Sequence, residues 1–202
     1  MQVKKQTQVN AVAQVHKFGG SSLANAARFA AVADILQQQN PQQALWVVVS
    51  APGDTTDALL QIIACGNDNA ARHSAQCALQ TQLDELVHQA LPAASAASVC
   101  KQLADWFAAV PQLLALQQPN EVLAIGERLS ALLLTEVLKQ RQLQAVAVDA
   151  RDFLRLDGSE VQYEVSSSWL APFETSGIKV VTGYIARDLQ GNSITLGRNG
   201  SD

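Results

Sequence analysis

The sequence lacks the features that mark several large classes of protein. A membrane-spanning helix needs about 20 consecutive apolar residues, and no stretch of this chain supplies them. There is no cluster of basic residues, and the formal net charge of -4 offers no attraction to nucleic acid or to an anionic membrane. Because 48% of the residues are apolar and only 16% are charged, the chain has enough apolar material for a folded core. We therefore expect a globular, cytoplasmic protein that binds neither nucleic acid nor a membrane.

Cysteine is scarce, and its distribution excludes the common disulfide and metal patterns. Cys65, Cys77 and Cys100 are odd in number, form no Cys-x-x-Cys pair and have no histidine at metal-ligand spacing. This usage is typical of reduced thiols inside a cell. We expect them to pack on helices, and we predict no metal ligand from the sequence.

The chain also lacks both familiar phosphate-binding loops, Gly-x-x-x-x-Gly-Lys and Gly-x-Gly-x-x-Gly. In their place it has Lys17-Phe18-Gly19-Gly20-Ser21-Ser22. This stretch joins an expected strand at 14–18 to an expected helix at 23–39. Paired glycines let the backbone pass close to a ligand, either serine can cap the helix, and the helix N-terminus beside Lys17 favours an anion. The stretch is a candidate phosphate cradle, and the alternative is an ordinary turn with a solvated lysine.

Strands and helices alternate along the chain, which predicts an α/β fold with a largely parallel sheet. The continuous apolar run at 44–49 predicts a strand buried on both faces. A further strand is expected at 145–148, a buried strand at 178–182, and an antiparallel hairpin at 184–197 with its turn at 188–192. A loop or hairpin is expected around Asp157-Gly158, and a short helix at 166–175.

The middle of the chain is helical in composition. Residues 58–118 are rich in Ala, Leu and Gln, and we expect a helical layer that packs on the sheet or on a partner chain, broken at Gly66-Asn67, Pro92 and Pro111. His73 and His88 are expected at the surface, and Trp106 and Phe107 in the core. A further helix should run from Pro119 to about Arg141, with an apolar stripe made of Val122, Ile125, Leu129, Leu132 and Leu133.

Two other positions combine glycine with polar groups. The loop from Ser50 to Asp57 follows a predicted strand, where open α/β sheets bind ligands; the alternative is a plain loop in which Asp54 or Thr55 caps the next helix. Gly126 lies inside the last long helix at a cost of about 1 kcal/mol, which suggests the close approach of another backbone or a ligand. Glu127 lies off the apolar stripe, so the pattern alone predicts a solvated glutamate.

Four stretches, in this order, resemble the motifs of the aspartokinase family. They are Lys17-Phe18-Gly19-Gly20-Ser21-Ser22, the loop from Ser50 to Thr56, Gly126-Glu127-Arg128-Leu129-Ser130, and Gly197-Arg198-Asn199-Gly200-Ser201-Asp202. Each motif is modest, but the ordered set covers nearly the whole chain and is specific. The sequence departs from the family at Asp57, where an asparagine is usual, and at Ile125, where many members have a histidine.

Within this family, two stretches look most like the bifunctional aspartokinase/homoserine dehydrogenases. They are the Arg-Asn-Gly-Ser-Asp ending and the segment 148–155. The methionine-branch type, number II, is the better match than the threonine-sensitive type. Another amino-acid kinase, such as one that acts on glutamate, and a non-catalytic binding or dimerisation module remain as alternatives.

The resemblance implies the amino-acid-kinase fold, a three-layer αβα sandwich with a mainly parallel sheet. It also implies Mg²⁺-dependent transfer of the γ-phosphoryl group of ATP to the β-carboxylate of L-aspartate, the first step toward lysine, threonine and methionine. Residues 14–202 would be the N-terminal, amino-acid-binding lobe, residues 1–13 a flexible tail, and the assembly a homo-oligomer. The nucleotide lobe, the regulatory domains and an NADP-dependent dehydrogenase would follow Asp202, so we expect the chain by itself to fold but not to turn over ATP.

The family's site residues carry over to matching positions. Lys17 would neutralise the moving phosphoryl group, while Gly19, Gly20 and Ser21 would bind the ATP phosphates. Asp202 would orient Lys17 or the metal shell, so Lys17 and Asp202 would be the catalytic residues. The substrate-binding residues would be Ser50, Thr56, Glu127, Arg198 and Ser201.

Two of these substrate-binding residues would hold the charged ends of the amino acid. The resemblance assigns the α-amino group to Glu127 and the α-carboxylate to Arg198. A guanidinium can grip a carboxylate through two parallel hydrogen bonds.

Overall fold

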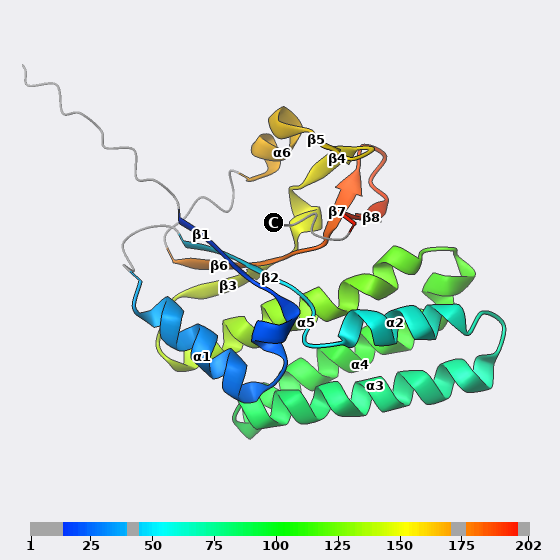
Figure 1. The fold of residues 1–202 in the computed structure, drawn as a ribbon, viewed down its shortest axis with the longest axis horizontal. Coiled ribbons are helices and arrows are strands. Elements are labelled where there is room, and N and C mark those ends of the chain that lie inside the picture. Colours follow the sequence, from blue (N-terminus) through cyan, green and yellow to red (C-terminus); the bar gives the residue numbers. More distant parts are fainter. Residues whose placement is uncertain (1–13, 40–44, 171–176, 198–202) are drawn as a thin grey trace, which may run out of the picture.

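The computed structural model describes residues 14–39, 45–170 and 177–197, and its main sheet has four parallel strands (Figure 1). The order across the sheet is β1-β2-β6-β3. The strands are β1 (Gln14–Phe18), β2 (Leu45–Val49), β3 (Ala145–Val148) and β6 (Ile178–Thr182). The predicted α/β class and parallel sheet are therefore confirmed.

The strand that is buried on both faces is β6, not β2 as predicted. All five residues of β6 are buried, whereas in β2 the buried residues Leu45, Val47 and Val49 alternate with the half-buried Trp46 and Val48. The prediction for β2 was wrong because only one of its faces packs into the large core. On the other face Trp46 meets the ring of Phe153 edge-on.

Helices stack in two layers on one side of this sheet (Figure 1). The inner layer consists of α1 (Ala26–Gln37) and α5 (Pro119–Gln140), and α5 contacts β2, β6 and β3. The other three helices are α2 (Thr55–Ala64), α3 (Asn69–Ala90) and α4 (Ala93–Ala115). Because α5 also contacts each of these, it is buried around most of its circumference. The predicted apolar stripe was too narrow, because Ser130 and Thr135, which lie outside it, are also buried. One residue of the predicted stripe, Leu132, is only half-buried.

The predicted breaks in the helical layer hold at Gly66-Asn67 and Pro92, but the break at Pro111 was wrong. Pro111 lies inside α4, which continues to Ala115. Proline cannot donate the usual helical hydrogen bond to the carbonyl four residues earlier, here that of Phe107. That oxygen instead accepts a hydrogen bond from Nε2 of Gln76, a buried residue of α3, at 3.1 Å. A side chain from the neighbouring helix thus replaces the missing bond.

A second, smaller sheet stands beyond the carboxyl ends of the main strands (Figure 1). Its order is β5-β4-β7-β8, and β7 and β8 form the predicted antiparallel hairpin. The strands are β4 (Arg155–Asp157), β5 (Glu160–Val161), β7 (Ile185–Asp188) and β8 (Ser193–Thr195). The β4–β5 pair is the turn expected around Asp157-Gly158. The short helix expected at 166–175 begins earlier, as α6 (Tyr163–Leu170), and residues 171–176 lie outside the described part.

The remaining sequence expectations concern single side chains. His73 and His88 are exposed and Phe107 is buried, as predicted, but Trp106 is only half-buried and packs against the edge of the core. All three cysteines are free thiols on or beside helices, although Cys77 is exposed. Among the described residues, no helix combines the length and apolar character that crossing a bilayer requires. The expected tail at 1–13 lies outside the described part.

The Gln76–Phe107 bond predicts an energetic coupling between positions 76 and 111. We expect Gln76→Met to lower the free energy of unfolding by about 1–3 kcal/mol, because it leaves a buried carbonyl oxygen without a donor. The loss should shrink in a Pro111→Ala background, where the new N–H group can donate to the same oxygen. Urea denaturation in a double-mutant cycle measures the coupling. Gln82→Met, at an exposed position of α3, is the matched control, and equal losses in both backgrounds would contradict the compensation.

Candidate functional site

The carboxyl ends of three neighbouring strands meet at one edge of the main sheet. Ser50 N, after β2, donates to the carbonyl of Phe18 in β1 at 3.1 Å, and Gly53 N donates to that of Gly20 at 3.0 Å. From the far side, Gly183 N after β6 donates to the carbonyl of Val49 at 2.8 Å. The Gly-Gly turn and the loop after β2 therefore lie side by side at this edge.

The end of the β7–β8 hairpin reaches the same edge. Leu196 N donates to the carbonyl of Tyr184, in the turn after β6, at 2.8 Å. The described chain continues to Gly197, so the start of the fourth motif lies beside the other strand ends. The proposed site residues Arg198, Ser201 and Asp202 lie outside the described residues.

The Gly-Gly turn packs closely at Gly20, but its partner there is the protein backbone and not the ligand that the sequence suggested. A Cβ atom on Gly20 would lie 2.8 Å from the carbonyl oxygen of Ala51 and 3.1 Å from that of Gly53. No other residue could hold the two loops this close. A Cβ atom on Gly19, in contrast, would meet nothing within 4 Å, so this glycine borders open space where a ligand could approach. Lys17 is exposed on β1 immediately before the turn.

The expected helix cap at this turn was wrong. A 3-10 helix, η1 (Gly20–Leu23), follows the glycines, and α1 starts only at Ala26. The cap is Asn25, whose Oδ1 accepts a hydrogen bond from Arg28 N at 3.0 Å, while Ser21 is exposed. Since Leu23 is fully buried, it anchors the short helix to the core and separates α1 from the turn. Any anion at the glycines would therefore face the amides of η1 and not the end of α1.

Helix α5 approaches the loop after β2 more closely than a side chain would allow. A Cβ atom on Gly126 would lie 2.5 Å from the Cβ of Ala51 and 3.2 Å from the Cγ2 of Thr55. The close approach expected at Gly126 is thus confirmed, with the loop as the partner. The capping alternative was wrong, because the side chain of Asp54 makes no capping bond and Thr55 Oγ1 donates instead to the carbonyl of Pro52 at 2.5 Å.

Glu127, the next residue on α5, is buried at the point where these loops meet. Only 2% of its surface is exposed, so the pattern-based prediction of a solvated glutamate was wrong. Its Oε1 accepts a hydrogen bond from Ala51 N at 3.2 Å, while its Oε2 has no hydrogen-bond partner among the described residues. A buried carboxylate with a spare oxygen is suited to bind a cation that enters from the loops.

Burial also changes the acidity of this side chain. The loss of solvent raises the pKa of Glu127 to about 7, although hydrogen bonds from its own backbone and from Ala51 partly oppose the rise. The carboxyl group therefore changes charge near neutral pH. A group whose pKa is displaced by burial at the meeting point of several loops is a candidate for a functional role.

Two other described site residues come from the loop after β2 and from the helix that follows it. Ser50 directly precedes Ala51, Thr56 is in the first turn of α2, and both are half-buried. Sequence reasoning missed the amide of Ala51, which carries no side-chain signal. It also missed the ion pairs that Arg151 forms with Glu121, at the start of α5, and with Asp149, which follows β3.

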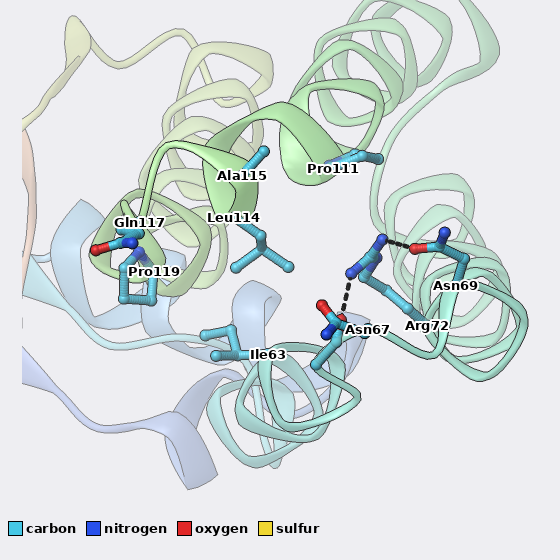
Figure 2. A pocket seen from close by; sticks show the side chains of 10 residues that line it. Ile63, Asn67, Asn69, Arg72, Pro111, Leu114, Ala115, Gln117 and Pro119 are labelled. Atoms are coloured by element: carbon cyan, nitrogen blue, oxygen red, sulfur yellow. Dashed lines mark hydrogen bonds between the residues drawn. The ribbon is translucent and has the colours of Figure 1, made fainter.

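Two larger hollows flank the helices and sheets. One, of about 600 Å³, opens beside the strand ends and is lined by Val48, Phe153, Val181, Thr182 and Gly197 among others. The other, of about 620 Å³, lies where α2 and α4 end and α3 and α5 begin (Figure 2). Figure 2 shows Arg72 in that hollow, where it donates to Asn69 in the first turn of its own helix and, at 2.7 Å, to the carbonyl of Gly66 in the loop before that helix. None of the predicted site residues that the structure describes lines this second hollow.

The described residues form no cluster of potential metal ligands. Nowhere in 14–39, 45–170 or 177–197 do three His, Cys, Asp or Glu side chains come together as a metal site would need.

Comparison with known sequences assigns nearly the whole chain to one family profile. The Amino acid kinase family matches residues 13–202. The bifunctional aspartokinase/homoserine dehydrogenase 2 of Escherichia coli is 33% identical over 94% of this chain and 25% of its own length. The aspartokinase of Chlamydia trachomatis is 29% identical over 93% of this chain and 43% of its own length. The chain thus spans from a quarter to less than half of these relatives.

Solved structures share the fold described above. Aspartokinase III of Escherichia coli, in complex with lysine and aspartate, superposes with a TM-score of 0.79 and 24% identity, over 95% of this chain and 45% of that one. The aspartate kinase of Clostridium acetobutylicum gives a TM-score of 0.74 and 21% identity over 93% of this chain and 42% of that one. At these identities the likeness extends to the fold alone.

The raised pKa of Glu127 predicts how stability depends on pH. Between the ordinary value of 4.5 and the folded value of about 7, the folded state binds a proton that the unfolded state has released. Stability should therefore fall as the pH rises through this interval. Glu127→Gln removes the titration, so the variant should lose this slope and exceed the parent by up to about 3 kcal/mol at alkaline pH.

Urea denaturation at a series of pH values measures this effect. Glu85→Gln, at an exposed position of α3, is the matched control and should leave the slope unchanged. A parent protein whose stability is flat or rises through this interval would contradict the burial of an uncompensated carboxyl group.

Proposed function

The chain belongs to the Amino acid kinase family, and from this premise we propose that it is the amino-acid-binding part of an aspartate kinase. The reaction is transfer of the γ-phosphoryl group of ATP to the β-carboxylate of L-aspartate. The observation that carries this proposal is the buried carboxylate of Glu127, held by Ala51 N and open at Oε2. Relatives of this chain are named as aspartokinases, which supports aspartate as the amino acid.

The α-amino group of the substrate is the cation that suits Glu127. An ammonium group can donate to Oε2 and supply the charge that burial otherwise leaves uncompensated. Ser50 and Thr56, from the same loop and the helix after it, would add hydrogen bonds to the bound amino acid. Arg198 would hold the α-carboxylate and Ser201 would assist, as the family resemblance implies.

The ATP phosphates would lie at the Gly-Gly turn. The open space at Gly19 and the exposed Lys17 support this assignment, and the amides of Gly20 and Ser21 in η1 would add donors. Lys17 would meet the negative charge of the moving phosphoryl group. Asp202 would orient Lys17 or the metal shell, and Lys17 and Asp202 remain the proposed catalytic residues.

This chemistry requires little from the protein besides positioning and charge neutralisation. The acceptor carboxylate is already an anion, so no general base is needed to activate it. Mg²⁺ neutralises phosphates in reactions of this class, and we assign none of the described residues to it. The Gly-Gly turn, proposed for the ATP phosphates, packs closely on the loop after β2, which is proposed for aspartate. This contact would keep the γ-phosphoryl group close to the aspartate carboxylate.

The parent protein would extend beyond this chain. The match to a bifunctional relative of which the chain covers only 25% supports a parent that also carries a homoserine dehydrogenase. In that parent, residues 14–202 would form the amino-acid-binding lobe, and later segments would bind the nucleotide and any NADP. Its free thiols suit a reducing compartment such as the cytoplasm, and assembly as a homo-oligomer follows from the family resemblance.

Lys17→Ala in the full-length protein tests the phosphate turn. We expect kcat for aspartate phosphorylation to fall by about 10²–10³-fold while the KM for aspartate changes little, because the lysine meets charge that develops during transfer. Steady-state kinetics of ADP release measures both constants. Lys101→Ala, an exposed position of α4, is the control. A near-normal kcat in Lys17→Ala would remove this residue from the mechanism.

Glu127→Gln in the full-length protein tests the amino-group site. Aspartate binding should weaken by about 10- to 100-fold, as expected for a hydrogen bond to a charged group, while ATP binding stays nearly unchanged. Affinity of the parent for aspartate should also fall as the pH drops below about 7, where Glu127 gains a proton. Calorimetric titration with each ligand measures these effects. Weaker ATP binding with unchanged aspartate binding would mean that the two subsites are assigned the wrong way round.

A further inference from the structure

The side chain of Arg151 lies between three segments that are distant in sequence. Arg151 belongs to a short 3-10 helix, η2 (Ala150–Asp152), and only 7% of its side chain is exposed. Its Nε and Nη2 atoms donate to the two carboxylate oxygens of Asp149 at 2.9 and 2.6 Å. Its Nη1 atom donates to Glu121 Oε2, in the first turn of α5, at 2.5 Å, and to Ser193 Oγ, in β8, at 3.1 Å. We call these four side chains the Arg151 network.

The network ties the β7–β8 hairpin to the start of α5. Besides its contact with Arg151, the hydroxyl of Ser193 donates to Glu121 Oε1 at 2.5 Å. Asn120, the neighbour of Glu121, donates through Nδ2 to the backbone carbonyl of Ser193 at 2.8 Å. Strand β8 is therefore held to α5 through both its side chain and its backbone.

The same arginine is fixed to the main sheet. Oδ1 of Asp149 accepts a hydrogen bond from the backbone N of Arg151 at 3.0 Å, which shapes η2. Ala150 N donates to the side-chain hydroxyl of Thr182, at the end of β6, at 2.8 Å. Because η2 cannot shift without breaking these bonds, Arg151 connects the main sheet to the hairpin in a fixed position.

The network holds one cation and two carboxylates, and Arg128 adds a second cation beside it. Burial pushes the pKa of Asp149 upward, but hydrogen bonds and the charge of Arg151 outweigh it and hold that pKa below its usual value. At Glu121, burial is likewise outweighed by bonds from Ser193 and Arg151, and its pKa is also lowered. A further cation, Arg128, stands 4.0 Å from Asp149 and stacks on the ring of Trp106 at 4.1 Å. Both carboxylates are therefore ionised at neutral pH, as the fork of Arg151 requires.

The two elements that this network joins carry opposite halves of the proposed aspartate site. Helix α5 carries Glu127, proposed for the α-amino group. Strand β8 leads through Leu196, which bonds to Tyr184, to Gly197 and the motif proposed for the α-carboxylate. The two charged ends of one small amino acid can be held together only if these halves keep a fixed separation. Misplacement by about 1 Å can reduce a rate about 10²-fold.

We propose that Arg151 is a positioning residue that sets the separation between Glu127 on α5 and the chain that leaves β8 at Gly197. It touches no substrate and acts through Glu121 and Ser193. The inference rests on the proposed function for its effect on aspartate, but the anchoring of the hairpin is a property of the fold itself. A lysine cannot replace this arginine, because it keeps the charge and loses the fork that reaches Asp149 and Glu121 together.

The experiment compares Arg151→Lys with Arg141→Lys in the full-length protein. Arg141 also pairs with an aspartate, Asp34, through Nη1 at 2.5 Å, but it lies at the other end of α5. We expect Arg151→Lys to raise the KM for aspartate by about 10- to 100-fold and to leave the KM for ATP within about twofold. Arg141→Lys should change neither constant, and because its partner Asp34 is exposed it should lower Tm less than Arg151→Lys does.

Hydrogen exchange supplies a second readout that a general loss of stability would not reproduce. Amides of residues 185–196 should exchange faster in Arg151→Lys, while those of β1, β2 and α1 keep the protection of the parent. Ser193→Ala removes one hydroxyl from the network with little change in volume. It should produce the same pattern more weakly, and it keeps the test open if the arginine variant fails to fold.

The outcomes separate this inference from the proposed function. Unchanged exchange in the hairpin, or an aspartate KM that rises no more than in Arg141→Lys, would overturn the positioning role. Faster exchange throughout the protein would reduce the network to a general stabilising feature and would also overturn it. If the full-length protein without substitutions releases no ADP in response to aspartate, only the proposed function fails. The exchange measurement still decides whether Arg151 anchors the hairpin.

Discussion

The arrangement of the site depends on how closely α5 approaches the loop after β2. At Gly126 the helix leaves no room for a single Cβ atom, since Ala51 and Thr55 occupy that space. This contact brings Ala51 N within reach of Glu127 Oε1 and seals the glutamate from water. The same loop then packs on Gly20, where again no side chain fits. Two glycines on different elements thus set the spacing of three segments, and the unusual acidity of one carboxyl group follows from that spacing.

Sequence patterns predicted the glycines of the site better than its polar groups. Gly20 and Gly126 could be recognised because glycine inside or beside a regular element suggests close packing. The environment of Glu127 could not, because helical periodicity separates only an apolar stripe from the rest of the surface. Here the rest of the surface faces other protein segments. The family resemblance identified this residue where the pattern alone did not, and the amide of Ala51 has no sequence signal at all.

The order of elements was similarly easier to predict than their surroundings. Three of the four strands of the main sheet, β2, β3 and β6, follow from short apolar runs, but which strand lies inside depends on pairing between distant segments. Pro111 illustrates the same limit, since a proline in a helix removes a bond that only tertiary structure can replace. The bond from Gln76 does so across 31 residues of sequence. Local rules therefore predicted a break where the folded protein has a continuous helix.

The position of β6 in the sheet has a consequence for how the chain folds. This strand lies between β2 and β3 but begins at Ile178, whereas β2 ends at Val49. During synthesis, the edges of β2 and β3 that pair with β6 stay without hydrogen-bond partners until residues 178–182 have emerged. Pairing between such distant segments slows folding and exposes the intermediate to aggregation. The helical layer made in the interval contains the longest helices of the described chain, and by folding early it could shield the apolar face of β2 until its partner arrives.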